Sequence, residues 1–252
     1  MGRALLDGWL AAGVLSPDAV IIVDPAASAP DGVHKLDDIT EGTAPDLIVL
    51  AIKPQQFADL APRLRSTAEG ALVLSILAGT GTAQLGQAFP GARVARIMAN
   101  LAAAFGQSPV ALYAQPGAIT PSDRALLERM GAALGPSSWL DDERLLHAVT
   151  ALGGSGPGFV YRLLQAFARA GAELGLEPDA AAAMALATFR GAAELAQRSG
   201  ESFADLAARV ASPGGTTEAG LAELERDHAA DRLVTVALRA ARDRSKDLAE
   251  GG

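Results

Sequence analysis

The chain has 252 residues, half of them hydrophobic and 4% aromatic, and its formal net charge is −8. This length and apolar content suffice for two folded domains with buried cores. The negative charge disfavours nucleic-acid binding, which needs a basic surface. Because there is no cysteine, disulfides and thiolate metal sites are excluded. His34, His147 and His228 lack metal-binding spacing, so we expect no metal site.

Hydropathy and the N-terminal charge pattern predict the cellular location of the protein. No apolar run approaches the roughly 20 residues that a membrane-spanning helix needs. The N-terminal segment lacks the charged stretch followed by an apolar stretch that marks a signal peptide. We therefore expect a cytoplasmic protein whose partner is a small molecule, and neither a membrane nor a nucleic acid.

Up to about residue 150, short apolar runs alternate with helical patterns. Almost wholly apolar runs are expected for parallel strands that are covered on both faces. Their alternation with helices predicts βαβ units and a parallel sheet. The expected strands are Val20–Asp24, Leu47–Ile52, Leu72–Leu77, Val94–Met98 and a run ending at Tyr113, and the expected helices are Pro54–Ser66, Gly81–Phe89 and Pro121–Leu134.

Beyond residue 150 only helical patterns remain. Apolar residues from Val160 to Leu174 recur at helical spacing, which predicts a core or a dimer interface. Further helices are predicted at Asp179–Arg198, Phe203–Val210 and Arg232–Leu248. Short junctions that contain Gly or Pro residues separate them. We therefore predict a domain boundary near residue 150.

The first residues suit a dinucleotide-binding domain of the Rossmann type. There a glycine-rich turn joins the first strand to a helix whose N-terminus holds the pyrophosphate, and an acid after the second strand binds the ribose. Gly2 suits the last glycine of that turn, and Asp24 suits the acid. An acid at a strand end also forms turns without any ligand, so both interpretations of Asp24 stay open.

The first strand and the earlier glycines of such a domain have no counterpart in the sequence. Loss of a central strand exposes hydrogen-bonding edges on its neighbours. We expect the reading frame to continue upstream of Met1 with a strand and a Gly-x-Gly pair; a degenerate relative is the alternative. The predicted fold is α/β: a Rossmann-like domain without its first strand at residues 1–150, then an all-α domain at residues 151–252.

Asp24 also bears on the choice of cofactor. A carboxylate at this position accepts hydrogen bonds from a free ribose and repels a 2′-phosphate. No Arg or Lys occurs in residues 25–30 that would bind such a phosphate. For a domain that binds NAD(P)H, the sequence therefore favours NADH over NADPH.

Several segments, in the right order, resemble the pyrroline-5-carboxylate reductase family. The most specific is Ser-Pro-Gly-Gly-Thr-Thr at Ser212–Thr217, which is identical to the family's motif. The departure is Met98–Ala102, where Met-Ala-Asn-Leu-Ala replaces the family's Met-Pro-Asn-Thr-Pro. The other matching segments are Ala51–Gln55, Ser75–Gly79, Gly154–Tyr161 and the closing pair Arg244-Ser245.

The resemblance implies a dimeric enzyme that reduces 1-pyrroline-5-carboxylate to L-proline with NAD(P)H, the last step of proline biosynthesis. The helical domain would interlock with its twin as a homodimer or higher homo-oligomer, with each active site near the dimer interface. Thr217 would hydrogen-bond the ring nitrogen. The substrate site would comprise Ser212, Gly214, Gly215, Thr216 and Thr217, and the cofactor site Gly2, Asp24, Ala51, Ile52, Lys53, Pro54, Ala78 and Asn100.

Each of these assignments has a plainer alternative. Ser212–Thr217 also suits a capped helix start near Glu218 after a tight turn. Lys53 also suits a solvated loop, and Asn100 also suits the cap of a turn. Gly154–Gly158 also suits the start of a helix. His147 is expected to be packed or at the surface, without a catalytic role. The altered Met98–Ala102 segment leaves open the reduction of another cyclic imine, and the lost strand leaves open a non-catalytic dimeric relative.

Overall fold

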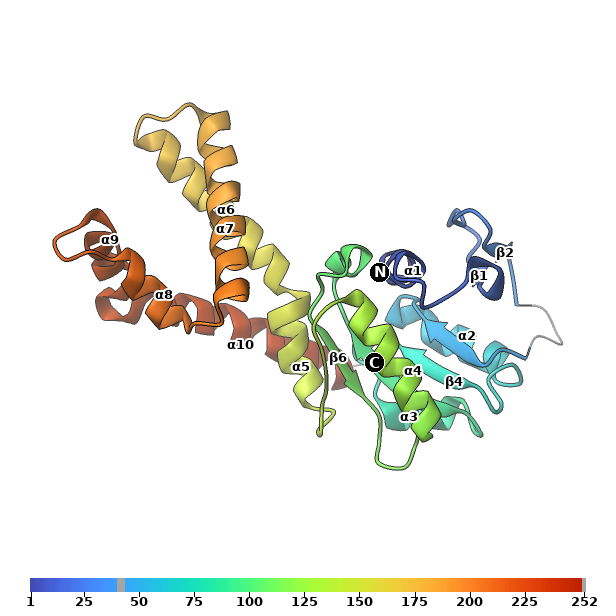
Figure 1. Cartoon of the computed structure of the whole chain (residues 1–252). Coiled ribbons are helices and arrows are strands. Elements are labelled where there is room, and N and C mark those ends of the chain that lie inside the picture. The colour runs from blue at the N-terminus through green and yellow to red at the C-terminus, as the bar shows by residue number, and fades with distance from the viewer. Residues whose placement is uncertain (40–43, 251–252) are drawn as a thin grey trace. The chain divides into compact units, whose positions relative to one another are not determined.

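The computed structural model describes residues 1–39 and 44–250 (Figure 1). Contacts divide the chain into two units: residues 1–154 together with 241–252, and residues 155–240. The predicted domains, 1–150 and 151–252, thus need one correction. The last residues return to the first unit, because the backbone of Leu248 lies against Gly79 and Ser245 contacts His147.

A five-stranded sheet in the order β3-β4-β5-β6-β7 forms the centre of the first unit. All neighbouring strands are parallel except β5 and β6, which are antiparallel. The connection from β5 to β6 contains only a 3₁₀ helix, Leu101–Phe105, and is short for a parallel crossover, so the chain returns in the opposite direction. The strands are β3 (Leu47–Leu50), β4 (Leu72–Ser75), β5 (Arg93–Met98), β6 (Val110–Tyr113) and β7 (Ser137–Trp139).

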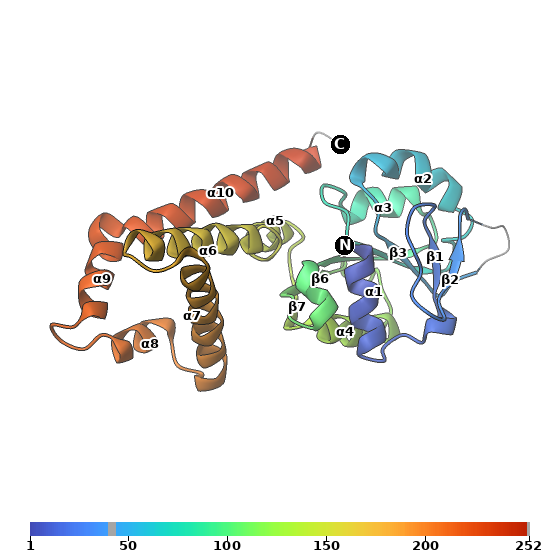
Figure 2. The same ribbon diagram turned by 90° about the horizontal axis from the view of Figure 1, so that it is seen from above.

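Helices cover both faces of this sheet, as Figure 2 shows. On β4, Leu72 and Leu74 pack toward α1 and α4, whereas Val73 packs toward α2 and α3. This alternation follows from the two-residue period of a strand, and it explains why the run is wholly apolar. The helices are α1 (Gly2–Ala11), α2 (Phe57–Leu64), α3 (Thr82–Ala88) and α4 (Pro121–Leu134).

Two further strands, β1 (Ile21–Val23) and β2 (His34–Leu36), form a separate parallel pair. No strand among the described residues joins β1 to β3, so each has an edge without a strand partner. Ile21 and Val23 are 47% and 46% exposed.

The remaining elements are helical, as predicted beyond residue 150. After α5 (Leu145–Val149), a π-helix spans Thr150–Gly154 and ends where the first unit ends. In the second unit α6 packs against α7, where Phe167 and Phe189 make an edge-to-face contact. The helices are α6 (Gly156–Glu173), α7 (Pro178–Ser199), α8 (Phe203–Val210), α9 (Thr216–Glu225) and α10 (Ala229–Glu250), which passes from the second unit into the first.

The second unit has almost no core of its own. Within residues 155–240, all of which the structure describes, only Ala181 and Ala185 are buried. Large apolar side chains are exposed instead, among them Phe203 at 83% and Leu186 at 59%. Apolar surface on this scale is typical of helices that a partner covers.

Candidate active site

The C-terminal ends of β3 and β4 lie side by side at one edge of the sheet. Leu50 pairs with Ser75, and the N–H of Ile76 donates to the carbonyl of Leu50 over 3.2 Å. Open α/β sheets bind their ligands at this edge. The structure therefore brings together the segments Ala51–Pro54 and Ile76–Ala78, which contain most of the residues predicted to bind the cofactor.

Gly2 is the first residue of α1 and lies against the same edge. A Cβ atom at Gly2 would be only 2.8 Å from the Cβ of Ala51, so only glycine allows this approach. The first turn of α1 carries no side-chain cap, which leaves its N–H groups for an anion such as a pyrophosphate. The residues present thus suit a dinucleotide at this position.

Lys53 is exposed and precedes the 3₁₀ helix that follows β3. Its N–H donates to Oε1 of Gln56 over 3.1 Å, and its carbonyl accepts from the N–H of Gln56 over 2.9 Å. These bonds hold the turn into the 3₁₀ helix Pro54–Gln56. The ammonium group forms no ion pair with any described residue. A cation at this edge suits phosphate oxygens, and cofactor binding by Lys53 stays a prediction.

Asp24 follows β1, as the ribose acid of a dinucleotide fold would. Its Oδ1 accepts hydrogen bonds from the N–H groups of Ala26 at 2.8 Å and Ala27 at 3.0 Å. The alternative role of Asp24 as a turn-former is therefore confirmed. Its Oδ2 has no hydrogen-bond partner among the residues that the structure describes, so one carboxylate oxygen remains for a ribose hydroxyl.

Arg3 is a cation beside the Asp24 turn, although residues 25–30 themselves contain no Arg or Lys. Its Nε donates to Asp7 over 2.7 Å, and its Nη1 donates to the carbonyl of Ser28 over 3.3 Å. The side chain is 54% exposed. Because Arg3 belongs to α1 and is remote in sequence, only the folded chain reveals that its guanidinium reaches this turn.

Asn100 lies just beyond β5 and is 9% exposed. Its Oδ1 accepts from the N–H of Ala102 at 2.9 Å and caps the 3₁₀ helix Leu101–Phe105, so the capping alternative is confirmed. Its Nδ2 donates to the carbonyl of Gly153 at 2.8 Å, inside the π-helix. With both ends of the amide engaged, contact between this side chain and a cofactor stays a prediction.

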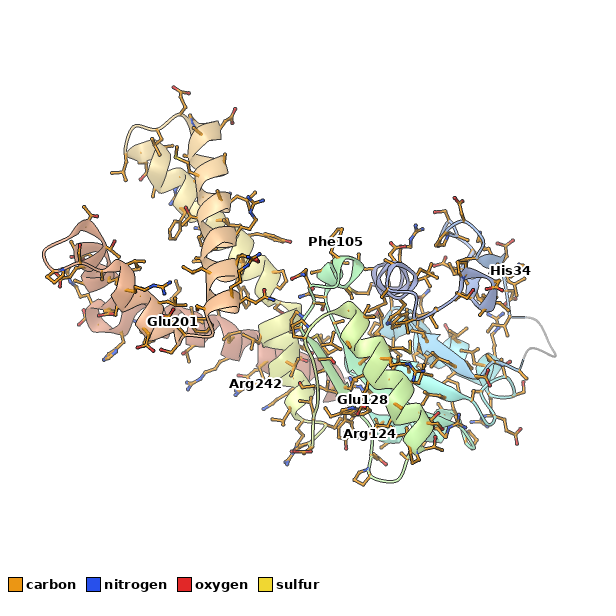
Figure 3. The ribbon with its side chains drawn as sticks, in the orientation of Figure 1. His34, Phe105, Arg124, Glu128, Glu201 and Arg242 are labelled. Carbon is orange, nitrogen blue, oxygen red and sulfur yellow. The ribbon has the colours of Figure 1, made fainter. Side chains whose placement is uncertain are left out.

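The segment that departs from the family pattern presents apolar groups to solvent. In the 3₁₀ helix after β5, Leu101 is 66% exposed and Phe105 is 81% exposed. Figure 3 shows Phe105 on the outside of the first unit. These side chains offer apolar surface beside the carboxyl end of β5. Leu101 stands where the family's motif has Thr, and Phe105 lies beyond that motif.

In the second unit, the Ser212–Thr217 loop leads into α9, which begins at Thr216, two residues before the expected start. Gly214 adopts a φ of 69°, in the left-handed region that favours glycine. A Cβ at Gly215 would overlap Ser212. The N–H groups of Thr216, Thr217 and Glu218 have no hydrogen-bond partner among the described residues. The loop therefore presents several backbone donors at a helix start, which suits a small anion.

A carboxylate already contacts this loop. Oε2 of Glu218 accepts a hydrogen bond from the N–H of Gly214 at 2.7 Å. Glu218 also lies in the first turn of α9, where a negative charge is favoured by the helix dipole. The loop thus binds a carboxyl group of its own chain with the same kind of donor that a substrate carboxylate would use.

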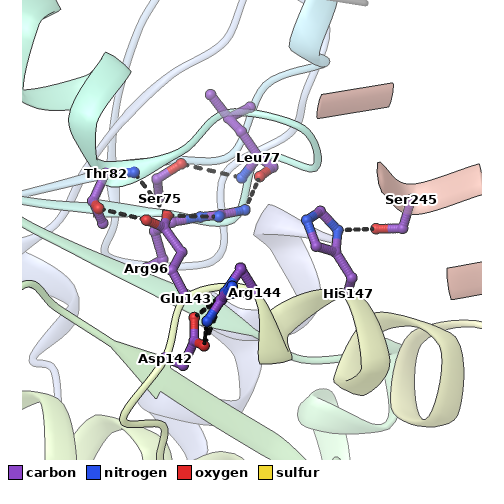
Figure 4. Close-up of polar contacts among 9 residues, drawn as sticks. All are labelled: Ser75, Leu77, Thr82, Arg96, Asp142, Glu143, Arg144, His147 and Ser245. Carbon is purple, nitrogen blue, oxygen red and sulfur yellow. Dashed lines mark hydrogen bonds and ion pairs between the residues drawn. The ribbon is translucent and has the colours of Figure 1, made fainter. Parts of the chain in front are cut away.

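A partly buried ion pair that the sequence patterns did not reveal lies near Ala78. Glu143 bonds Arg96 and Thr82, and Arg96 also reaches the carbonyl of Leu77, as Figure 4 shows. Burial raises the pKa of Glu143, but the hydrogen bonds from Thr82 and Arg96 outweigh it and hold the pKa below its usual value. These residues are far apart in sequence, and no local motif indicated them.

The fold, the residues at the ends of β3 and β4, and the Ser212–Thr217 loop define an α/β oxidoreductase of the nicotinamide-dependent class. In this class a helical domain follows the dinucleotide-binding sheet. Two family profiles match the chain. Residues 1–79 match "NADP oxidoreductase coenzyme F420-dependent", and residues 143–248 match "Pyrroline-5-carboxylate reductase dimerisation". No helix in the described part of the chain is long and apolar enough to cross a membrane.

Full-length relatives identify the family. The pyrroline-5-carboxylate reductase of Pseudomonas aeruginosa is 37% identical over 99% of this chain and 94% of its own length. Pyrroline-5-carboxylate reductase 2 of Bacillus subtilis is 35% identical over 89% and 84%. The chain belongs to the pyrroline-5-carboxylate reductase family.

Solved structures agree on the fold. The Coxiella burnetii pyrroline-5-carboxylate reductase superposes with a TM-score of 0.89 at 28% identity, over 98% of this chain and 94% of its own. The Plasmodium falciparum pyrroline carboxylate reductase, solved with NADP bound, superposes with a TM-score of 0.85 at 21% identity, over 99% and 94%.

Proposed function

We propose that this chain reduces 1-pyrroline-5-carboxylate to L-proline with a reduced nicotinamide cofactor, as the last step of proline biosynthesis. The observation that carries this is the unaltered Ser212–Thr217 loop at the start of α9, in a chain that is 37% identical to a pyrroline-5-carboxylate reductase over 99% of its length. The substrate has one carboxylate and one imine nitrogen. The loop supplies backbone donors for the first and a hydroxyl for the second.

The roles of the residues follow from the chemistry of an imine. When bound, a reduced nicotinamide supplies the hydride that the imine carbon accepts. The N–H groups of Thr216 and Glu218 and the left-handed turn at Gly214 hold the carboxylate. Thr217 donates its hydroxyl hydrogen to the ring nitrogen, and a threonine hydroxyl is too weak an acid to do more than orient the ring and relay a proton from water. Most of the rate would come from holding the reactants in position.

The cofactor would bind at the ends of β3 and β4. Gly2 and the first turn of α1 suit its pyrophosphate, Ala51–Pro54 and Ala78 suit the surface beneath it, and Lys53 suits a phosphate oxygen. We propose that Asp24 makes NADH the better cofactor, because its free Oδ2 suits a ribose hydroxyl and repels a 2′-phosphate. Arg3 opposes this preference, since its guanidinium bonds the carbonyl of Ser28 in the same turn.

The test is a rate measurement on the purified chain. With 1-pyrroline-5-carboxylate and either NADH or NADPH, we expect loss of reduced nicotinamide absorbance and an equal amount of proline by amino-acid analysis. A chain that neither consumes the cofactor nor binds it, judged by nicotinamide fluorescence and thermal shift, would instead be the non-catalytic relative.

Reduction of a larger cyclic imine is the competing activity. Exposed Leu101 and Phe105 favour it, because an apolar surface at the end of β5 would suit a bulkier ring. Measuring kcat/KM for 1-pyrroline-5-carboxylate and for six-membered and aryl-substituted cyclic imines distinguishes the two. A higher value for a larger imine would replace the assigned substrate and keep the reaction type.

We also propose that the second unit assembles with a second copy of this chain. Two buried alanines cannot stabilise its helices, whereas exposed residues such as Phe203, Leu186 and Val236 provide apolar surface for a partner. Light scattering coupled to size-exclusion chromatography should give at least twice the chain mass. A monomer that keeps its helical circular dichroism on dilution would contradict this assembly.

A further inference from the structure

The loop from Leu77 to Thr82 is held at both ends by side chains outside the cofactor site. It follows β4, contains the predicted cofactor residue Ala78, and leads into α3. Gly79 in its middle has a φ of 80°, and a Cβ there would lie 2.6 Å from the carbonyl oxygen of Leu248. The end of α10 therefore bounds the loop on one side, and the conformation of Gly79 excludes larger residues.

One carboxylate fixes the far end of this loop. Oε1 of Glu143 accepts from the N–H of Thr82 at 2.8 Å, and Oε2 accepts from the Thr82 hydroxyl at 2.7 Å. Thr82 is the first residue of α3, and Gly81 before it makes no side-chain cap. Glu143 therefore caps α3 from a distant part of the chain and fixes where the loop ends.

The same carboxylate fixes the near end through Arg96. Oε1 of Glu143 accepts from Nη1 of Arg96 at 2.9 Å, and Nη2 of Arg96 donates to the carbonyl of Leu77 at 3.0 Å. The N–H of Leu77 donates in turn to Oγ of Ser75 at 3.1 Å. Both backbone groups of Leu77 are thereby held, immediately before Ala78.

The pair is largely shielded from water. The side chains of Arg96 and Glu143 are 13% and 24% exposed. Screening by water is weaker there than at the surface, and loss of one partner would leave the other charge uncompensated. By contrast, the adjacent Asp142 forms an exposed pair with Arg144 that makes no contact with the loop among the described residues (Figure 4).

We propose that Glu143 is a positioning residue for cofactor binding: through Thr82 and Arg96 it sets the conformation of the Leu77–Thr82 loop, on which the nicotinamide cofactor rests. This inference depends on the proposed function, since it assumes that Ala78 faces the cofactor. Glu143 itself touches neither cofactor nor substrate. Its effect should appear in cofactor affinity, whereas affinity for the imine, which binds the Ser212–Thr217 loop, should change little.

The experiment compares Glu143→Gln with Asp142→Asn in the full chain. The control removes one negative charge from the neighbouring residue without disturbing the loop. We expect Glu143→Gln to raise the Kd for NADH, measured by nicotinamide fluorescence, by about tenfold or more, with the KM for 1-pyrroline-5-carboxylate changed by less than about twofold. Asp142→Asn should leave both constants within about twofold of those of the unaltered chain.

A second variant tests the same inference even if Glu143→Gln folds poorly. Arg96→Lys keeps the charge, but a single ammonium cannot reproduce the forked bonds to Glu143 and Leu77. It should also weaken NADH binding, and hydrogen exchange of peptides spanning residues 77–82 should become faster in both variants before cofactor is added.

The outcomes separate this inference from the proposed function. If the unaltered chain binds no nicotinamide cofactor, both the proposed function and the inference on Glu143 are wrong. If the unaltered chain is active, a purely structural role predicts that the variants lose thermal stability while the Kd for NADH stays within about twofold, and this would overturn the inference alone. Equal increases in the Kd for NADH and the KM for the imine would also overturn it, because they would indicate general distortion.

Discussion

The Nδ1 atom of His147 lies 3.0 Å from the hydroxyl oxygen of Ser245, and this hydrogen bond joins α5 to the C-terminal part of α10 (Figure 4). The two residues are 98 positions apart in sequence. Ser245 is 9% exposed, so little water competes for the bond. The contact explains why α10 ends in the first unit. His147 is partly buried, and the sequence pattern predicted a histidine that is either packed or at the surface.

Replacing Ser245 by alanine should therefore destabilise the first unit. Loss of one largely buried hydrogen bond costs about 1 kcal/mol, and the imidazole nitrogen loses its hydroxyl partner. The measurement is the free energy of unfolding by urea, followed by tryptophan fluorescence, since Trp9 lies in the core of this unit. Ser199→Ala is the control, because its exposed hydroxyl bonds only nearby backbone and should contribute little. Equal effects of the two substitutions would contradict the role of Ser245.

Gly8 should not tolerate alanine. It lies in α1 where the helix packs on the 3₁₀ helix Leu101–Phe105, and a Cβ there would overlap the carbonyl of Ala103 and approach Leu134. Alanine normally stabilises a helix interior relative to glycine, but here overpacking should cost about 1–3 kcal/mol. Gly86→Ala in α3 is the control. No atom lies within 4 Å of a Cβ at that position, so stability should rise by about 0.5–1 kcal/mol. Urea unfolding measures both, and a stabilised Gly8→Ala chain would refute the packing.

Most elements could be predicted because their signals are local. Pro121–Leu134 was predicted to the residue, since Pro121 occupies the first turn and Thr120 and Asp123 form a capping box before an apolar helix. Phe203–Val210 was likewise predicted correctly. The strands β3 and β4 were predicted two residues too long, because Ile52 and Leu77 continue the apolar run after the ladder ends. In contrast, β5 begins one residue earlier than predicted, at Arg93.

Long-range features could not be predicted in this way. β7 is Ser-Ser-Trp, without an apolar run, and becomes a strand only because β6 offers an edge for pairing. The cofactor segments were identified from their similarity to the family. In contrast, Glu143, Arg96 and Thr82 form a group only after the chain folds. Arg3 was missed for the same reason, since α1 carries it to the turn after β1.

Acid should destabilise the first unit through two carboxylates. Burial raises the pKa of Asp123, but hydrogen bonds from Arg93 and Thr120 outweigh it, so the pKa lies below its ordinary value. The pKa of Glu143 is lowered in the same way by bonds from Thr82 and Arg96. In both groups the pKa is lower in the folded chain than in the unfolded chain. The stabilisation is therefore complete above the ordinary pKa, which is 3.8 for Asp123 and 4.5 for Glu143. It is lost as the pH falls through the lower pKa of the folded chain. The free energy of unfolding should therefore fall steeply below about pH 4.5.

Glu143→Gln tests this pH dependence, because glutamine does not titrate. Its free energy of unfolding should be lower than that of the unaltered chain at neutral pH, and it should decline less steeply in acid. Glu69→Gln is the matched control, since Glu69 is exposed and forms no ion pair with a described residue. Parallel pH profiles for the unaltered chain and Glu143→Gln would exclude Glu143 as a source of acid sensitivity.

The cofactor preference should depend on the charge of Asp24. In Asp24→Asn the amide oxygen can still accept from Ala26 and Ala27, so the turn is kept while the repulsion of a 2′-phosphate is removed. We expect kcat/KM for NADPH to rise relative to that for NADH by about tenfold, as removal of one close like-charge contact implies. Asp31→Asn, an exposed acid with no ion pair to a described residue, should leave the ratio unchanged. A chain that prefers NADPH before any substitution would show that Arg3 or another cation outweighs Asp24.

Thr217 should matter for turnover more than for binding. In Thr217→Ala the ring nitrogen loses its donor while the N–H groups at the start of α9 still hold the carboxylate, so kcat should fall by about tenfold to a hundredfold with a smaller change in KM. Thr217→Ser keeps the hydroxyl and should retain most of the activity. Thr188→Ala is the control, because that exposed hydroxyl only bonds the carbonyl of Met184 in its own helix. If Thr217→Ala turned over as fast as the unaltered chain, the proton would reach the nitrogen by another route, and the loop would serve only to bind the carboxylate.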